Sequence, residues 1–269
     1  MLRKKPRLGQ HFLVDQQLAR RITEASGIRP ADLVIEIGPG RGAMTRLLAD
    51  QCAHLVAVEI DPALAANLRT EFQNEPRVEI VQADILQTDL SAQVRDRGFT
   101  QCLVFGNLPY YITSPILQHM FGFQHFIRAM ATLIQLEVAE RITAKPGSRD
   151  YGYLSVLAQL YSSPHITLKI SPGAFSPPPN VTSALVLFPM VRRFPAWDEQ
   201  TQTGFLGFVK RSFTSKRKNL LNNLSGLRPR TQLERILKKL GLPLTARAEE
   251  VSIDELARLY ETLMALPAP

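Results

Sequence analysis

Residues 33–43 read Leu33-Val34-Ile35-Glu36-Ile37-Gly38-Pro39-Gly40-Arg41-Gly42-Ala43 and join an apolar, β-branched run to a glycine-rich segment. The first five of these residues predict a buried strand, and residues 43–51 have the apolar spacing of a helix. Glycines at such a junction allow a tight turn and let a ligand approach backbone N–H groups at the start of the helix. The stretch is therefore typical of the first strand, turn and helix of a ligand-binding α/β fold.

The same alternation continues through the centre of the chain. Further strands are expected at residues 55–59, 78–82, 103–105 and 130–135, and helices at residues 16–26, 62–74, 91–97, 114–121 and 137–144. This order predicts a doubly wound parallel sheet with ligand sites at the carboxyl ends of its strands. A helix at 153–161 and two strands at 166–170 and 184–188, which could form an antiparallel hairpin, are expected to close this part.

Beyond Met190 the strand patterns end. Apolar residues recur at helical spacing in residues 203–215, 231–240 and 252–263, and the proline-containing segment 189–197 precedes them. We therefore expect an α/β domain over residues 1–189, with a basic N-terminal arm at 1–11, and a small all-helical domain over residues 190–269.

The composition excludes several classes of protein. Of the 269 residues, 45% are apolar, which is enough for a sizeable core. No run approaches the roughly 18 apolar residues of a membrane span, and no signal-peptide pattern follows the N-terminal charges. Cys52 and Cys102 lie in apolar segments and indicate no disulfide framework, and the five histidines lack metal-ligand spacing. We expect a soluble, cytoplasmic protein that holds no metal and does not bind a membrane.

The net charge of +8 is unevenly distributed. Residues 12–189 carry 14 basic and 16 acidic side chains, whereas residues 190–269 carry 14 basic and 8 acidic side chains. Two basic clusters contain no acid, one made of Arg3, Lys4, Lys5 and Arg7 and the other of Lys210, Arg211, Lys216, Arg217 and Lys218. Separate basic clusters at both ends of the chain favour a polyanionic partner such as a nucleic acid, and a solvated helix face or a loose tail is the alternative for either cluster.

Asn107-Leu108-Pro109-Tyr110 follows the expected strand at 103–105 and has the parts needed to methylate an exocyclic amine of a base. The lone pair of such an amine is conjugated with the ring, so acceptors must hold its N–H groups and aim the lone pair at an electrophile. The Asn107 side-chain oxygen and the Leu108 carbonyl are suitable acceptors, and Pro109 favours an extended Leu108. Tyr110 offers a flat face to a flipped base. A plain turn after a strand is the alternative for these four residues.

Gly38, Gly40 and Ala43 also satisfy the spacing of a dinucleotide-binding fingerprint, and Glu59 lies where a ribose-binding acid is expected. These residues by themselves fit either a nicotinamide cofactor or S-adenosylmethionine, because both present a ribose. Asp84, after the third expected strand, is suited to accept a hydrogen bond from an adenine amino group. Together with the amine-binding tetrad, it favours S-adenosylmethionine.

With these residues in place, the chain resembles the ribosomal RNA adenine N6-dimethyltransferases, most closely those that modify small-subunit (16S) rRNA. The resemblance covers nearly the whole chain and rests on Gly9-Gln10-His11-Phe12-Leu13, Glu36 to Gly42, Glu59, Asp84, Asn107 to Tyr110, Tyr151-Gly152-x-Leu154-Ser155-Val156, Phe175-x-Pro177-Pro178-Pro179-x-Val181-x-Ser183, Arg217-Lys218 and Arg247-Ala248-Glu249. It implies a Rossmann-like class I S-adenosylmethionine-dependent methyltransferase fold with a small C-terminal all-helical domain.

The resemblance also implies roles for individual residues. It implies contacts to S-adenosylmethionine from His11, Leu13, Gly38, Glu59, Asp84 and Asn107. It implies that Phe175 is the second aromatic of a clamp that stacks the flipped base against Tyr110. Two positions depart from the family, because His11 and Tyr111 stand where asparagine is common. An imidazole can still donate one hydrogen bond, and Tyr111 is expected to alter the pocket wall more than the chemistry.

The implied activity is dimethylation at N6 of two adjacent adenosines near the 3′ end of 16S rRNA, with a role in ribosome biogenesis. Direct in-line transfer by a monomer acting on the small subunit or its assembly precursor is expected. Two alternatives are an enzyme that methylates 23S rRNA and confers macrolide resistance, and a non-catalytic ribosome-assembly factor. Arg217-Lys218 and Arg247-Ala248-Glu249 disfavour the first, and the intact Asn107 and Tyr110 disfavour the second.

Overall fold

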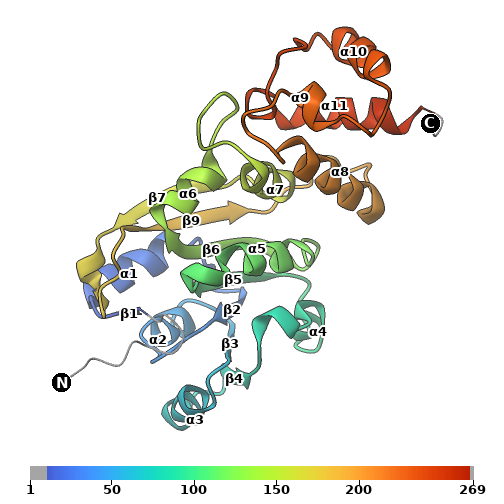
Figure 1. Ribbon diagram of the computed structural model, residues 1–269. Coiled ribbons are helices and arrows are strands. Elements are labelled where there is room, and N and C mark those ends of the chain that lie inside the picture. Colours follow the sequence, from blue (N-terminus) through green and yellow to red (C-terminus); the bar gives the residue numbers. More distant parts are fainter. Residues whose placement is uncertain (1–10, 267–269) are drawn as a thin grey trace. The chain divides into compact units, whose positions relative to one another are not determined.

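The computed structural model describes residues 11–266, which divide into two compact units. The first unit contains residues 11–139 and 163–190, and the second contains residues 140–162 and 191–266 (Figure 1). The chain therefore passes between the units three times, whereas the sequence indicated one boundary after residue 189. Residues 140–162 have a helical pattern that fits either kind of domain, so the sequence pattern could not assign them.

A seven-stranded sheet forms the centre of the first unit (Figure 1). Its strands in spatial order are β4 (Val78–Gln82), β3 (His54–Glu59), β2 (Leu33–Ile37), β5 (Cys102–Asn107), β6 (Ile127–Gln135), β9 (Ser183–Pro189) and β7 (His165–Ile170). The first five are parallel, and β9 pairs antiparallel with both β6 and β7. The predicted parallel sheet and its antiparallel closing pair are confirmed. From β2, the chain first adds strands on one side of the sheet, β3 and then β4, and afterwards on the other side, β5 and then β6. An open α/β sheet binds its ligand at such a switch point, here between β2 and β5.

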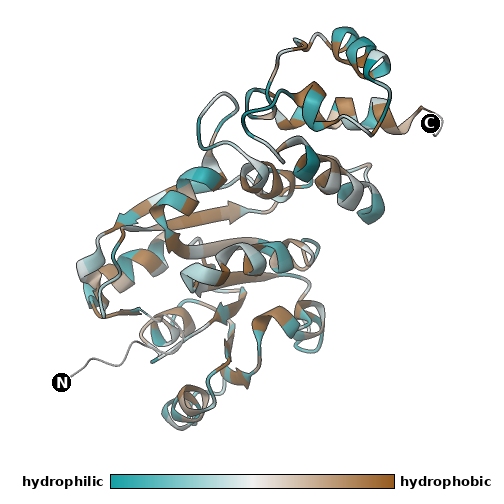
Figure 2. Ribbon diagram, in the orientation of Figure 1, coloured by the Kyte–Doolittle hydropathy of each residue, from teal (hydrophilic) through white to brown (hydrophobic). Residues whose placement is uncertain are grey.

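The helices of the first unit are α1 (Gln16–Ala25), α2 (Thr45–Ala49), α3 (Pro62–Glu71), α4 (Leu90–Arg95) and α5 (Thr113–Phe121), with the short turns η1 (Ile85–Gln87), η2 (Tyr110–Ile112) and η3 (Pro172–Ala174). All five residues of β2 are buried, as expected for a central parallel strand covered on both faces. Val34 of β2 belongs to one core cluster with Ile22 of α1 and Leu48 of α2. Figure 2 shows β6 and β9 coloured as hydrophobic along most of their length.

A second, two-stranded sheet joins distant parts of the first unit. Strand β1 (Phe12–Leu13) pairs antiparallel with β8 (Phe175–Ser176), so that Leu13 lies opposite Phe175. The Val14 N–H also donates to the Ala174 carbonyl at 2.9 Å. No sequence pattern indicated either strand, because two residues are too few to show a period. This pairing holds the residues after position 11 against the segment that follows η3.

The second unit is built from α7 (Tyr153–Tyr161), α8 (Glu199–Ser212), α9 (Leu220–Asn223), α10 (Arg230–Lys239), η4 (Ala248–Glu250) and α11 (Ile253–Met264), while α6 (Leu136–Thr143) begins in the first unit and ends in the second. Trp197, Phe205, Phe208 and Tyr260 pack their rings together in its core. Helix α8 starts earlier than expected because Asp198 caps it, accepting from the Thr201 N–H at 2.8 Å.

Candidate functional site

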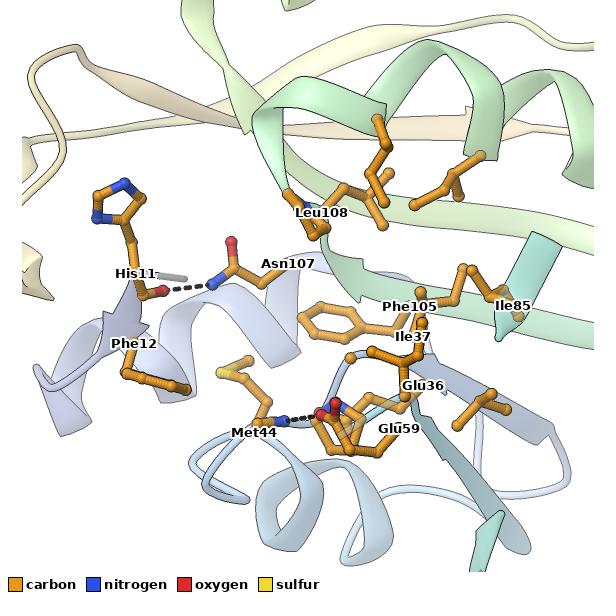
Figure 3. Close-up of a pocket in the computed structure, with 18 of the residues that line it drawn as sticks. His11, Phe12, Glu36, Ile37, Met44, Glu59, Ile85, Phe105, Asn107 and Leu108 are labelled. Carbon is orange, nitrogen blue, oxygen red and sulfur yellow. Dashed lines mark hydrogen bonds between the residues drawn. The ribbon is translucent and has the colours of Figure 1, made fainter. Parts of the chain in front are cut away.

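A pocket opens at the carboxyl ends of β2, β3, β4 and β5, all within the first unit (Figure 3). Its walls come from segments 11–13, 36–41, 43–44, 58–60, 83–85 and 107–112, with Phe105 and Ile116. Every residue expected to hold the cofactor lines it, namely His11, Leu13, Gly38, Glu59, Asp84 and Asn107. Leu108, Pro109 and Tyr110 line it as well. The structure therefore brings together predicted site residues as far apart in the chain as His11 and Tyr110, which are 99 positions apart.

The glycine turn after β2 forms one wall of the pocket. Gly38 and Gly40 have φ angles of +65° and +61°, a left-handed conformation that favours glycine. A Cβ on Gly40 would also lie 2.9 Å from Cε1 of Phe12, which itself lines the pocket. Glycine at position 40 thus serves both the turn and the close approach of β1.

Glu59 ties this turn to the end of β3. Its side chain is only 1% exposed, and its Oε2 accepts from the Gly40 N–H at 3.0 Å (Figure 3). Its Oε1 accepts from the Asp61 N–H at 2.9 Å. A carboxylate oxygen can accept more than one hydrogen bond, so both oxygens retain capacity for a ligand. Glu59 is therefore held rigidly at the pocket, at the position where the sequence predicted a ribose-binding acid.

Glu36 is a pocket residue for which the sequence predicted no separate role. Burial raises the pKa of this carboxyl from 4.5 to about 8, with a contact to Thr45 that opposes the rise and the nearby charge of Glu59 that adds to it. Its Oε2 is buried without a hydrogen-bond partner among the described residues. Glu36 therefore holds its proton more tightly than an exposed carboxyl does, and its Oε2 is an unsatisfied buried acceptor.

Asp84 lies at the end of β4. Its Oδ1 accepts from the Leu86 N–H at 2.9 Å and caps η1, which orients the carboxylate toward the start of that turn. Because Asp84 also lines the pocket, its second oxygen is available as an acceptor. Three acidic side chains, those of Glu36, Glu59 and Asp84, therefore stand at the ends of three neighbouring strands.

The orientation of Asn107 is set by a main-chain contact. At the end of β5, its Nδ2 donates to the carbonyl of His11 at 3.0 Å. A carbonyl can only accept, so the amide atom that faces the His11 carbonyl is the nitrogen and the other is the oxygen Oδ1. Figure 3 shows the amide oxygen pointing away from the His11 main chain. The side chain thus presents an acceptor, as the chemistry inferred from the sequence requires.

Tyr110 begins η2, three residues after Asn107. Its hydroxyl shares a hydrogen bond with the buried Ser183 Oγ at 2.7 Å, and burial raises the pKa of the phenol. The His11 imidazole stacks on its ring, with 5.7 Å between ring centroids and 29° between planes. Tyr111, the next residue, is 64% exposed and also lines the pocket. The phenol ring is therefore anchored at one end and covered on one face.

The ring of Phe175, which the resemblance predicted as the second aromatic of a stacking clamp, does not line the pocket in this structure. Its side chain is 3% exposed and belongs to the core cluster that contains Ile22, Leu48 and Leu133. The physical reason is the pairing of β8 with β1, which turns the ring into the apolar core. In this structure Phe175 supports the wall behind Leu13 and offers no face to a base.

The basic residues predicted to bind RNA lie outside the pocket. Lys210, Arg211, Lys216, Arg217 and Lys218 are exposed in the second unit, at the end of α8 and in the segment before α9. Two of them have contacts within that unit, because Lys216 Nζ donates to the Arg149 carbonyl at 3.4 Å and Arg211 Nη2 donates to the Ser225 carbonyl at 2.6 Å. Arg3, Lys4, Lys5 and Arg7 lie outside the described residues.

Within residues 11–266, no group of three His, Cys, Asp or Glu side chains is placed to hold a metal ion. No helix in the described part of the chain is both long and apolar enough to span a membrane.

Comparison with known proteins gives consistent matches. The sequence model of the family "Ribosomal RNA adenine dimethylase" matches residues 1–265. The chain is 43% identical to "Ribosomal RNA small subunit methyltransferase A" of Acidobacterium capsulatum, over 96% of this chain and 91% of that protein. It is 30% identical to the crystal structure of the 23S rRNA methyltransferase ErmE, with a TM-score of 0.72 over 94% of this chain and 99% of the other. A dimethyladenosine transferase from Plasmodium falciparum, 19% identical, shares the fold with a TM-score of 0.79 over 93% of this chain and 96% of the other.

Proposed function

Because this chain belongs to the ribosomal RNA adenine dimethylase family, we propose that it transfers methyl groups from S-adenosylmethionine to N6 of adenosines in 16S rRNA. The targets implied by the resemblance are two adjacent adenosines near the 3′ end, in the small subunit or its assembly precursor. One observation carries the proposal. The amide oxygen of Asn107 is fixed as an acceptor at a pocket whose other walls hold Glu59 and Asp84.

The pocket residues fit the proposed methyl donor. Gly38 and Gly40 bring backbone close to a ligand, Glu59 offers rigid acceptors for ribose hydroxyls, and Asp84 has an oxygen for an adenine amino group. When bound, S-adenosylmethionine supplies an activated methyl group on a sulfonium.

The chain's own part in the reaction is to orient the acceptor amine. Asn107 Oδ1 and the Leu108 carbonyl accept the two N–H groups of the adenine amine, which turns its lone pair toward the methyl group. The C–N bond then forms as the C–S bond breaks, and the methylated amine loses its proton to water afterwards. No side chain has to remove a proton first, so catalysis consists mainly of positioning. Tyr110 holds the flipped base by stacking.

The basic residues of the second unit are proposed to dock the rRNA. They are exposed, and the run from Lys210 to Lys218 contains no acid, so it can bind phosphates. Arg217 and Lys218 also belong to the residues on which the resemblance to the family rests. The N-terminal arm, with Arg3, Lys4, Lys5 and Arg7, is proposed to add to this attraction. We further propose that the chain acts as a monomer in the cytoplasm, where its rRNA substrate is assembled.

Methylation of 23S rRNA is the second candidate, because ErmE matches 94% of this chain at 30% identity. The higher identity, 43%, to a protein named for the small subunit supports the first candidate.

The test is mass spectrometry of 16S and 23S rRNA from a strain that lacks its own 16S dimethylase and expresses this chain or Asn107→Ala. We expect two dimethyladenosines in 16S rRNA with the wild-type chain and none with Asn107→Ala. Modification of 23S rRNA alone would favour the second candidate. Restored ribosome assembly with both chains and no methylation would show an assembly factor instead.

For the methyl donor, calorimetry should show binding of S-adenosylmethionine and little binding of NADH. Asp84→Ala should weaken the binding of S-adenosylmethionine. An unchanged affinity would remove Asp84 from the site.

A further inference from the structure

We propose that the imidazole of His11 is a place-holder that covers the base-stacking face of Tyr110 until the target adenine displaces it. This inference rests on the proposed function, because it concerns how the same site receives its substrate. It assigns to the His11 side chain a role separate from that of the His11 carbonyl, which orients Asn107.

Two contacts fix the imidazole in this position. It stacks on the Tyr110 ring, with 5.7 Å between centroids and 29° between planes. Its Nδ1 lies 2.8 Å from the carbonyl oxygen of Pro177, and because a carbonyl only accepts, Nδ1 carries the proton. The imidazole therefore shields an aromatic face that would otherwise contact water.

No base can enter between the two rings as they stand. Carbon atoms in contact lie about 3.5–4.0 Å apart, so a base sandwiched between two rings requires roughly 7 Å between them. The centroids of His11 and Tyr110 are closer than this. An adenine that stacks on this face of Tyr110 must therefore take the place of the imidazole.

The acceptor on Asn107 points to the same place. Figure 3 shows its amide oxygen directed to the side of the site on which the His11 ring lies. A base that gives one amino hydrogen to this oxygen and stacks on Tyr110 would overlap the imidazole. The two contacts that the reaction requires therefore converge on the space that His11 fills.

Displacement requires only a side-chain rotation. The bond from Nδ1 to the Pro177 carbonyl is exposed, so water can replace both partners when it breaks. The His11 carbonyl, which receives the Asn107 amide, belongs to the main chain and need not move. Asn107 thus keeps its orientation while the ring leaves, and rotamer changes of this kind are fast compared with turnover.

The experiment measures base stacking directly, without methyl transfer. Small ribosomal subunits are assembled with 2-aminopurine in place of one target adenosine, and its fluorescence is titrated with protein in the absence of S-adenosylmethionine. The probe has the purine ring but no amine at C6, so it reports stacking more than the contact with Asn107. Omitting the methyl donor prevents any change in donor binding from affecting the result.

Removing the place-holder should strengthen flipping. We expect His11→Ala to lower the titration midpoint on the order of 3- to 10-fold, the size of one aromatic pair, relative to the wild type. His165→Ala, which removes an exposed histidine from β7, is the matched control and should leave the midpoint unchanged. His11→Asn, which restores the residue common in the family, should behave like His11→Ala because an amide covers the ring less well.

The sign of the change decides between the two roles that His11 could have. If His11→Ala and His11→Asn both raise the midpoint or leave it unchanged, the imidazole is not a place-holder, and a raised midpoint would make it part of the clamp on the base. Equal melting temperatures of wild type and variants exclude a folding defect as the cause. If the wild-type chain produces no fluorescence change at all, the proposed function fails and this inference fails with it.

Discussion

Asn107→Asp should abolish most methyl transfer although the side chain hardly changes in shape. In the structure, Nδ2 of Asn107 donates to the His11 carbonyl at 3.0 Å, and aspartate has no proton to donate. Two oxygens would then face each other across that distance, and the carboxylate must rotate out of its position. Losing the orienting bond costs about 1–3 kcal/mol, which corresponds to roughly a 5- to 150-fold slower step if it is felt fully in the transition state.

Single-turnover methylation of immature small subunits, with S-adenosylmethionine saturating, isolates this step from binding and product release. Asn74→Asp, which adds the same charge at an exposed turn after α3, is the matched control and should keep the wild-type rate. Asn107→Ala should be at least as slow as Asn107→Asp, because it removes the acceptor too. Wild-type rates in Asn107→Asp would show that the bond to His11 does not orient a reacting group, and the tetrad would then be an ordinary turn.

Stacking, RNA docking and the buried acid can each be tested separately. Tyr110→Phe keeps the stacking ring and should retain most activity, whereas Tyr110→Ala should cost roughly 1–3 kcal/mol of flipped-base binding; equal inactivity would show that the hydroxyl bonded to Ser183 is essential. Neutralising Lys216, Arg217 and Lys218 together should make a plot of log binding constant against log salt concentration less steep. The slope should change by about 0.7–0.9 for each phosphate contact that is lost. An unaltered slope would mean that these side chains contact only solvent. The pKa of Glu36 is raised, so the folded protein holds the carboxyl proton of Glu36 more tightly than the unfolded chain does. The free energy of unfolding should therefore fall as pH rises from 4.5 to about 8. Glu36→Gln cannot ionise and should flatten that fall in urea denaturation; a curve identical to that of the wild type would refute the burial argument.

The parts of this fold that local pattern specifies were predicted well. The apolar run at residues 33–37 predicts strand β2, and the glycines after it predict a turn with positive φ. Both signals lie in residues that are close together in the sequence. The placement of Glu59 and Asp84 at the pocket follows from the rule that parallel strands end at one edge. These features needed no knowledge of distant contacts.

What the sequence could not supply depends on pairs far apart in the chain. The bonds from Asn107 to His11 and from Tyr110 to Ser183 join residues 96 and 73 positions apart. The burial of Phe175 could not be read from its proline-rich context, which indicates a stiff segment and carries no information about which way a ring faces. The unusual protonation of Glu36 likewise arises from the surrounding core, and the sequence shows only a carboxylate among apolar residues.

The interleaving of the two units limits how the protein can be dissected. Helix α7 is encoded before β7 and β9, yet it packs against α8 and α11, which come after them. A truncated fragment that ends at residue 190 would retain α7 but lose both of these partners. Buried residues of α7, among them Val156, Leu157 and Leu160, would then form an exposed, aggregation-prone apolar surface. A fragment meant to contain only the first unit must therefore leave out residues 140–162 as well.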